Sequence, residues 1–191
     1  MKRCQWVDLE NPLYIKYHDK EWGVPVHSDR KLFEMLVLEG AQAGLSWATV
    51  LKKRTAYKKA FDNFDFNKIA KYSNAKQKQL LKNEALIRNH LKISSTIQNA
   101  KIFIEIRKEF GTFDKYIWAF VNYRPIQNKF RNLKEVPTKT PLSEKISKDL
   151  KKRGMNFVGP TIIYAYIQAI GMVNDHQTNC FRHEEIAKFS K

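Results

Sequence analysis

The sequence holds 191 residues, the length of one domain, and 43% of them are hydrophobic, so the chain can bury a core. Lysine and arginine number 35 against 19 aspartate and glutamate residues, which gives a formal net charge of +16. This composition excludes an intrinsically disordered chain, and the charge favours a polyanionic partner such as nucleic acid. The alternative explanation of the charge is an AT-rich genome that raises the lysine content generally.

No segment has the pattern of a signal peptide or a membrane span. The residues after Met1 lead into no apolar run, and the longest apolar stretch, roughly Thr161 to Val173, is too short to cross a bilayer. We therefore expect a soluble protein in a reducing compartment. There, the two cysteines, Cys4 and Cys180, are expected to be metal ligands or free thiols before a disulfide.

The pattern of apolar residues predicts helices nearly throughout the chain. Six are marked by apolar side chains at helical spacing: Leu32 to Glu39 after a start at Ser28–Asp29, Val50 to Phe61 after Ser46, Ile93 to Ile104, Tyr116 to Phe120, Leu142 to Leu150, and Pro160 to about Met172. No segment alternates as a strand would, and the stretch 122–141 predicts a loop. We expect an all-α fold in a single domain over residues 1–191, or two helical lobes with a helical insertion near residues 62–115.

Glu39 is a carboxylate on the apolar face of the first predicted helix. It follows Leu32 by seven residues and Leu36 by three, offsets that put the three side chains on one face, where an ionised carboxylate is unfavourable without a partner. Aromatic residues lie near it in sequence, namely Trp6, Tyr14, Tyr17, Trp22 and Trp47. A carboxylate among aromatic rings suits a flat, cationic ligand. Alternatively, the rings belong to the core and Glu39 reaches water at the helix end.

A turn with glycine at both ends separates the last two predicted helices. It runs from Gly154 to Gly159 and follows three cations, Lys151, Lys152 and Arg153. Glycine lets backbone N–H groups approach a phosphate, the next helix N-terminus adds its dipole, and the cations add non-specific attraction. The segment resembles a helix–hairpin–helix DNA-binding element, and the alternative is an ordinary corner between two helices.

A second turn joins the first two predicted helices. Its small residues include Gly44, and Leu45 is an apolar tip. Such a tip can fill the gap that remains when a base is pulled out of a DNA stack. The alternative is that Leu45 attaches the next helix to the core.

Two cysteines and two histidines form a candidate metal site. His176 and Cys180 are four residues apart and point the same way on a helical turn, while Cys4 and His18 form a second pair near the N-terminus. Two thiolates and two imidazoles complete the closed tetrahedral shell of a structural zinc ion. Such a site would join the N- and C-terminal segments. The alternatives are a chance distribution of these residues and a disulfide between the cysteines.

Ten short motifs are spread along the chain: Arg3–Trp6, Pro12–Ile15, Tyr17–Asp19, Glu21–Pro25, Lys31–Met35, Leu38–Gly40, Ala43–Trp47, Trp118–Asn122, Phe157–Gly159 and Asn174–His176. Together they cover nearly the whole chain and resemble the 3-methyladenine DNA glycosylase I family. The resemblance implies a helix–hairpin–helix glycosylase fold with one structural Zn²⁺ ion per chain, bound through Cys4, His18, His176 and Cys180.

The resemblance also implies the roles of the site residues. It places Glu39, Tyr17 and Trp47 in the base pocket and Tyr14 and Trp22 in the aromatic wall around it, with a wedge in the loop Ala43–Leu45. We also expect Trp6 to contribute to substrate binding. The family is understood to work without the aspartate that most hairpin glycosylases use. Asp175, which precedes His176, is therefore interpreted as orienting the zinc ligand or supporting the backbone.

The implied activity is hydrolytic release of a flipped 3-methyladenine from alkylated double-stranded DNA. This would leave an abasic site, with no strand cleavage and with free 3-methyladenine as the product. We also expect a monomer in the bacterial cytoplasm, associated with the nucleoid when bound to DNA. Two other classes remain open: an inactive, zinc-stabilised DNA-binding module, and a sensor that binds purine cations without DNA.

Overall fold

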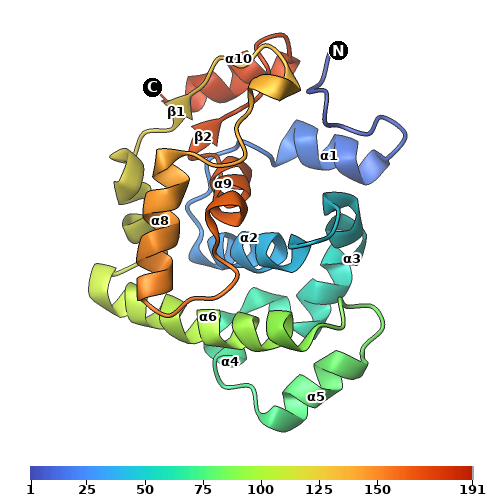
Figure 1. Ribbon diagram of the computed structural model, residues 1–191, viewed down its shortest axis with the longest axis vertical. Helices are drawn as coiled ribbons and strands as arrows, with labels where there is room; N and C mark the ends of the chain where they lie inside the picture. The colour runs from blue at the N-terminus through green and yellow to red at the C-terminus, as the bar shows by residue number, and fades with distance from the viewer. Residues whose placement is uncertain (191) are drawn as a thin grey trace.

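The computed structural model describes residues 1–190, and helices dominate it (Figure 1). The α-helices are α1 (Pro12–Lys20), α2 (Asp29–Gln42), α3 (Trp47–Ala60), α4 (Phe66–Ile69), α5 (Asn74–Lys82), α6 (His90–Phe110), α7 (Phe113–Trp118), α8 (Pro141–Lys152), α9 (Pro160–Ala169) and α10 (Phe181–Ala187). Short 3₁₀ helices span η1 (Asp62–Phe64), η2 (Ala119–Val121), η3 (Leu133–Glu135) and η4 (Lys188–Ser190). Two strands, β1 (Ile126–Gln127) and β2 (Val173–Asn174), complete the fold.

The six predicted helices correspond to α2, α3, α6, α7, α8 and α9. Ser46 caps α3 by accepting a hydrogen bond from the Thr49 N–H, and Pro160 opens α9, as expected. Ser28 precedes α2, but its side chain makes no capping bond. Instead, the Asp29 carboxylate accepts hydrogen bonds from the backbone of α7, which ties the start of α2 to that helix.

The prediction that the chain contains no strand is wrong. β1 and β2 pair in parallel, with Ile126 opposite Val173 and Gln127 opposite Asn174. Two residues are too few to display the alternation that marks a strand. The same pair places ordered structure inside the predicted loop 122–141, which also contains η3. Helices α1 and α10 were not predicted, and α4 and α5 lie within the expected helical insertion 62–115 but were not predicted individually; none of the four exceeds nine residues, so their apolar patterns are short.

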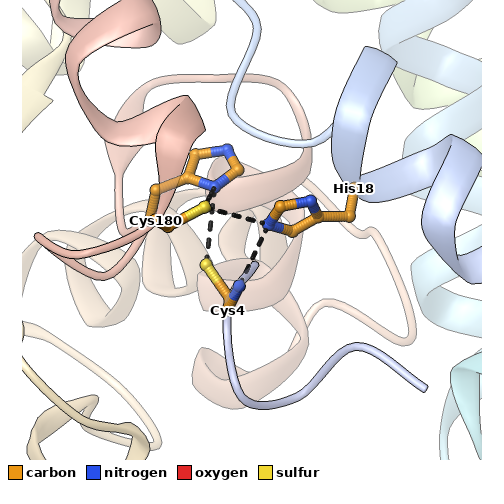
Figure 2. A group of neighbouring side chains, drawn as sticks. Cys4, His18 and Cys180 are labelled. Carbon is orange, nitrogen blue, oxygen red and sulfur yellow. Dashed lines mark hydrogen bonds between the residues drawn. The ribbon is translucent and has the colours of Figure 1, made fainter. Parts of the chain in front are cut away.

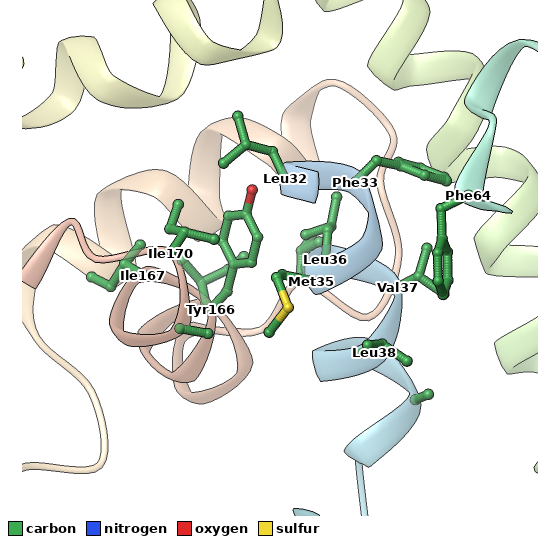
Figure 3. Close-up of a cluster of buried hydrophobic side chains, with 14 of the residues drawn as sticks. Leu32, Phe33, Met35, Leu36, Val37, Leu38, Phe64, Tyr166, Ile167 and Ile170 are labelled. Carbon is green, nitrogen blue, oxygen red and sulfur yellow. The ribbon is translucent and has the colours of Figure 1, made fainter. Parts of the chain in front are cut away.

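Helix α2 lies at the centre of the molecule and packs against α3, α6, α7 and α9. Leu32, Phe33, Met35 and Leu36 are almost fully buried (Figure 3). Tyr166 and neighbouring apolar side chains of α9 pack against this helix. Because α2 is enclosed on several sides, the position and direction of its last turn, which carries Glu39, are fixed by the core.

Within residues 62–115, α6 packs against α2, and α4 and α5 both pack on α6. The buried core continues across this group and the rest of the described chain. Division into two helical lobes therefore stays a prediction. None of the helices within residues 1–190 combines the length and hydrophobicity needed to span a membrane.

Candidate functional site

The four predicted metal ligands converge from three distant segments. Cys4 precedes α1, His18 lies on α1, and His176 and Cys180 lie between β2 and α10 (Figure 2). All four side chains are buried, and their ligand atoms lie within 4.8 Å of one another. The hydrogen bond with the Cys4 thiol, followed by those with His176 and His18, lowers the pKa of the Cys180 thiol and so favours its thiolate form. These residues could hold a metal ion.

Polar groups outside the cluster fix both imidazole rings. The Nδ1 atom of His18 lies 2.7 Å from an Asp19 carboxylate oxygen, and Arg3 in turn donates to Asp19. His176 directs Nε2 to the Trp22 carbonyl oxygen at 3.0 Å. The free ring atoms, Nε2 of His18 and Nδ1 of His176, therefore face the thiols. This is the arrangement that orients histidine ligands in metal sites.

A cavity of about 230 Å³ lies beside this cluster. Its lining residues are Trp6, Tyr17, Trp22, Glu39, Gln42, Trp47, Leu133, Val136, Ala165, Gln168, Asp175 and Gln177. The Trp22 ring packs edge-on against His176 at 4.6 Å, and Trp6 packs edge-on against His18 at 5.4 Å. The histidines of the cluster therefore support the Trp6 and Trp22 rings that line the cavity.

Glu39 is the one glutamate in the cavity lining, and it is 4% exposed. Burial raises the pKa of Glu39 to about 8, because an ionised carboxylate loses its hydration there. The alternative in which Glu39 reaches water at the helix end is therefore wrong. A cationic group placed in the cavity would favour the ionised form of Glu39.

The aromatic residues near Glu39 divide into two sets. Trp6, Tyr17, Trp22 and Trp47 line the cavity, with the Tyr17 and Trp47 rings 5.1 Å apart. The prediction that Tyr14 belongs to the cavity wall is wrong: Tyr14 does not line the cavity, and its ring packs edge-on against Trp6 at 5.8 Å. Within residues 1–190, the buried indole N–H groups of Trp6 and Trp47 have no hydrogen-bond partner. A ligand with acceptor atoms would satisfy them.

Asp175 supports the wall of the cavity. Its carboxylate accepts hydrogen bonds from Asn128, Tyr164 and Gln168 and so connects α9 with the chain beside β1. The residues that orient His18 and His176 are instead Asp19 and Trp22. Of the two roles interpreted for Asp175, support of the surrounding structure agrees with these contacts.

The segment between α8 and α9 is a tight turn, as its glycines predict. Gly154 has φ +98°, a conformation that favours glycine, and Gly159 directly precedes α9. Lys151 and Lys152 are exposed. Arg153 differs from them, because its guanidinium forms ion pairs with Glu109 and Asp149. The charge of Arg153 is thus already neutralised within the chain.

The loop after α2 lies next to this turn. Gly44 has φ +73°, and the Leu45 side chain is 42% exposed. Gly40 permits the close approach of the two segments, since a Cβ atom there would lie 3.3 Å from Cβ of Phe157. A smaller cavity, lined partly by Leu45 and Thr161, shares Glu39 and Gln42 with the larger one. The smaller cavity therefore extends from the surface near Leu45 to Glu39.

Comparison with known proteins identifies the family of the chain. The sequence model of the methyladenine glycosylase family matches residues 6–183. The chain belongs to the methyladenine glycosylase family. It is 48% identical over 178 residues to a DNA-3-methyladenine glycosylase of Haemophilus influenzae, covering 93% of this chain and 96% of that protein. The methyladenine glycosylase family is enzymatic, so the chain is a glycosylase.

Solved structures of the family have the same fold. A 3-methyladenine DNA glycosylase I with 48% identity superposes with a TM-score of 0.92, covering 95% of this chain and all of that one. The enzyme of Staphylococcus aureus, whose recognition of 3-methyladenine has been described structurally, has 31% identity and a TM-score of 0.88, covering 90% and 92% of the two chains. The methyladenine glycosylase fold therefore extends over nearly the whole chain.

Several cavity residues were not predicted. Gln42 follows Glu39 by three residues on α2, an offset that already placed it on the same face. Leu133 and Val136 come from the segment 122–141, where no periodic pattern indicated that they would close the cavity. Gln168 and Gln177 reach the cavity only because α9 and the C-terminal segment pack beside α2 and the N-terminal segment.

Proposed function

We propose that this glycosylase releases 3-methyladenine from alkylated double-stranded DNA by hydrolysis and leaves an abasic site. The observation that carries the proposal is the buried Glu39 carboxyl group within an aromatic cavity. Methylation at N3 gives the adenine of a nucleoside a positive charge. A flat cation gains from both features of this cavity, because aromatic faces and a carboxylate attract it together. The names of the relatives agree with this substrate.

Glu39, Trp47 and Tyr17 are assigned to recognition of the base. Glu39 accepts a hydrogen bond from the exocyclic amino group of the base and favours its cationic form. Trp47 stacks on the ring, and Tyr17 forms the adjoining wall. The pKa of the Tyr17 hydroxyl lies well above its ordinary value, chiefly because of burial, so this hydroxyl stays protonated and can donate.

Bond cleavage then needs little help from acid catalysis. The methylated base departs as a neutral molecule, so the enzyme has no need to protonate it, and water attacks the sugar C1′. Among the described residues, no lysine lines the cavity. We therefore infer a monofunctional enzyme that forms no Schiff base with the sugar and does not cleave the strand.

DNA binding is assigned to the two turns beside the cavity. The N-terminus of α9, preceded by Gly154 and Gly159, binds a phosphate, and Lys151 and Lys152 supply attraction to the backbone. Leu45 enters the duplex where the methylated base leaves it. The shared residues of the two cavities give the flipped base a short path to Glu39.

We infer that the metal of the cysteine–histidine cluster is zinc. Tetrahedral Zn²⁺ with bonds of about 2.3 Å to sulfur and 2.0–2.1 Å to nitrogen places S and N atoms about 3.6 Å apart. The Sγ of Cys180 lies 3.4 Å from Nε2 of His18 and 3.6 Å from Nδ1 of His176, and Cys4 Sγ lies 3.5 Å from the same Nδ1. Four protein ligands leave no position for water, so the ion is structural.

Chromatography of the bases released from methylated duplex DNA tests the proposal. We expect free 3-methyladenine together with intact strands that break at abasic sites only after alkali treatment. Binding of DNA without release would indicate the inactive DNA-binding module. Binding of the free base without affinity for DNA would indicate the purine sensor.

A further inference from the structure

Lys92 is a buried lysine whose charge is directed at the loop that carries Leu45. It is 9% exposed, and its Nζ atom donates hydrogen bonds to the carbonyl oxygens of Ala41, at 2.8 Å, and Ala43, at 2.6 Å. Ala41 lies in the last turn of α2, and Ala43 immediately precedes Gly44. One ammonium group therefore holds the end of α2 and the start of the loop together.

The position of Lys92 is unfavourable by local rules. It is the third residue of α6, and a cation in the first turn opposes the positive end of the helix dipole. Desolvation lowers the pKa of its ammonium group. The partial negative charge on the last carbonyls of α2 offsets both effects. Lys92 therefore violates a local preference and is compensated by its contact with the end of α2. Such a violation indicates that the contact is required for function.

The loop that Lys92 holds has little else to fix its direction. Nothing lies within 4 Å of the position that a Cβ atom of Gly44 would occupy, and Leu45 projects into solvent. Within the loop, Ala43 and Leu45 donate only to Gly40 and Gln42 of the same turn. The carbonyl of Ala43 is therefore the point at which the loop is attached to another part of the molecule.

Asn99 makes an equivalent attachment to the turn between α8 and α9. Its side-chain amide donates to the Asn156 carbonyl oxygen at 2.8 Å, and its side-chain oxygen accepts from the Asn156 N–H at 2.9 Å. Asn99 follows Lys92 by seven residues, two helical turns, so both lie on one face of α6. A single rigid helix thus holds both turns that lie beside the cavity.

We propose that α6 sets the position of the Leu45 loop relative to the turn at Asn156, with Lys92 as a positioning residue for base flipping. The inference rests on the DNA-binding roles proposed above for these two turns. When the turn at Asn156 is bound to the phosphate backbone, Lys92 places Leu45 at the base step that opens. Lys92 itself contacts neither the DNA nor the base, because it is buried under the loop.

Lys92→Met tests this role in the full-length protein. Lys101→Met is the matched control, since Lys101 is exposed on the same helix and its replacement changes the net charge equally. We expect Lys92→Met to reduce single-turnover release from duplex DNA by about 10- to 100-fold, the size of effect that a misplaced contact produces. Binding of free 3-methyladenine, measured by tryptophan fluorescence, should stay within about twofold of wild type, because Lys92 is not part of the cavity lining.

Two further readouts separate positioning from charge and from general stability. Lys92→Met should leave the salt dependence of DNA binding unchanged, since each phosphate contact contributes about 0.9 to the log–log slope and Lys92 makes none. The double variant Lys92→Met with Leu45→Ala should release the base no more slowly than the slower of the two single variants, because Lys92 acts through Leu45. Asn99→Leu provides a second variant and should reduce release in the same range.

Four results would overturn the inference. The first is a rate of base release by Lys92→Met that equals the wild-type rate. The second is a double variant with Leu45→Ala whose loss of release equals the sum of the two single losses in free energy. The third is a Lys92→Met variant that loses binding of the free base as much as it loses release. If Leu45→Ala itself leaves release unchanged, the wedge proposed above is wrong and the positioning role falls with it. If Leu45→Ala reduces release but Lys92→Met does not, the wedge proposal stands and only the positioning role of Lys92 is wrong.

Discussion

At the scale of single residues, the burial of Glu39 has a measurable consequence for folding. The pKa of its carboxyl group is raised by desolvation from an ordinary value of 4.5 to about 8. The folded protein therefore holds a proton on Glu39 at pH values at which the unfolded chain has lost it. The burial of Glu39 therefore lowers the free energy of unfolding at neutral pH relative to its value at acidic pH.

The first prediction concerns stability against pH. Because the folded pKa is raised, the contribution of Glu39 is favourable below pH 4.5 and is lost as the pH rises through about 8. Relative to Glu39→Gln, the free energy of unfolding of the wild type should fall by about 3 kcal/mol between pH 5 and pH 8. Urea unfolding at both pH values measures this difference. Tyr17→Phe, which alters the same cavity, is the control and should show no such trend.

The identity of several site residues could be predicted from sequence because local spacing carries the information. The offsets of Glu39 from Leu32 and Leu36 indicate a buried carboxylate, and the structure confirms it. Leu133 and Val136 could not be found in this way. Their segment is held at the cavity by long-range contacts, namely the pairing of β1 with β2 and the hydrogen bond from the Leu133 N–H to the Gln5 side chain, and such contacts leave no periodic signal in the sequence.

At the scale of elements, the turn between α8 and α9 separates cations with different roles. Lys151 and Lys152 are exposed, whereas Arg153 joins Glu109 and Asp149 and lies over the Phe110 and Tyr116 rings. From the sequence, all three residues are expected to contact DNA, because their charges are equal and they are adjacent. Their side chains leave the end of α8 in different directions, and only the fold reveals the acidic partners of Arg153.

The second prediction follows from this difference. Replacing both Lys151 and Lys152 by alanine should reduce the log–log salt slope of DNA binding, by about 0.9 for each phosphate contact that is lost. Arg153→Ala should leave the slope nearly unchanged and lower the free energy of unfolding by about 1 kcal/mol, through lost ion pairs and packing. Fluorescence anisotropy at several salt concentrations measures the slope. An unchanged slope in the double lysine variant would place the DNA contacts elsewhere.

Each of the six predicted helices corresponds to an α-helix of the structure, although the predicted segment Tyr116–Phe120 is divided between α7, which ends at Trp118, and η2. The unpredicted elements are short and depend on contacts with the rest of the chain. Helix α10, for example, begins directly after Cys180, and the Phe181 N–H donates to the Lys2 carbonyl oxygen. Its position follows from the meeting of the two terminal segments, which no local pattern encodes.

At the scale of the whole molecule, the cysteine–histidine cluster connects Cys4 with Cys180 and supports the cavity wall. A metal ion bound there would close a loop that includes almost the entire chain. Structural zinc contributes on the order of 10 kcal/mol of apparent folding free energy, which is comparable with the total stability of a domain.

The third prediction is one zinc ion per chain in protein purified without chelator, measured by elemental analysis. Cys180→Ala should lose the metal and unfold at a far lower temperature, while its folded fraction keeps the Glu39 cavity and releases base. Asp19→Asn, which neutralises the carboxylate beside His18 Nδ1 and removes its ion pair with Arg3, should keep the ion with about 10- to 100-fold lower affinity. Wild-type protein without metal would refute the assignment.

The central claim is that Glu39 selects 3-methyladenine. Adenine presents an amino donor at position 6, where guanine presents an acceptor oxygen. Beside an ionised Glu39, 7-methylguanine, which is also cationic, therefore loses a charge-assisted hydrogen bond and gains lone-pair repulsion. The loss is roughly 2–3 kcal/mol, or about a hundredfold in rate if it is felt in the transition state. An amide at this position can donate as well as accept.

Single-turnover release of 3-methyladenine and 7-methylguanine by the wild type and by Glu39→Gln tests this claim most directly. The wild type should release 3-methyladenine about a hundred times faster than 7-methylguanine. Glu39→Gln should release 3-methyladenine more slowly and discriminate less between the two bases. Equal release of both bases by the wild type, or full activity and selectivity in Glu39→Gln, would contradict the account.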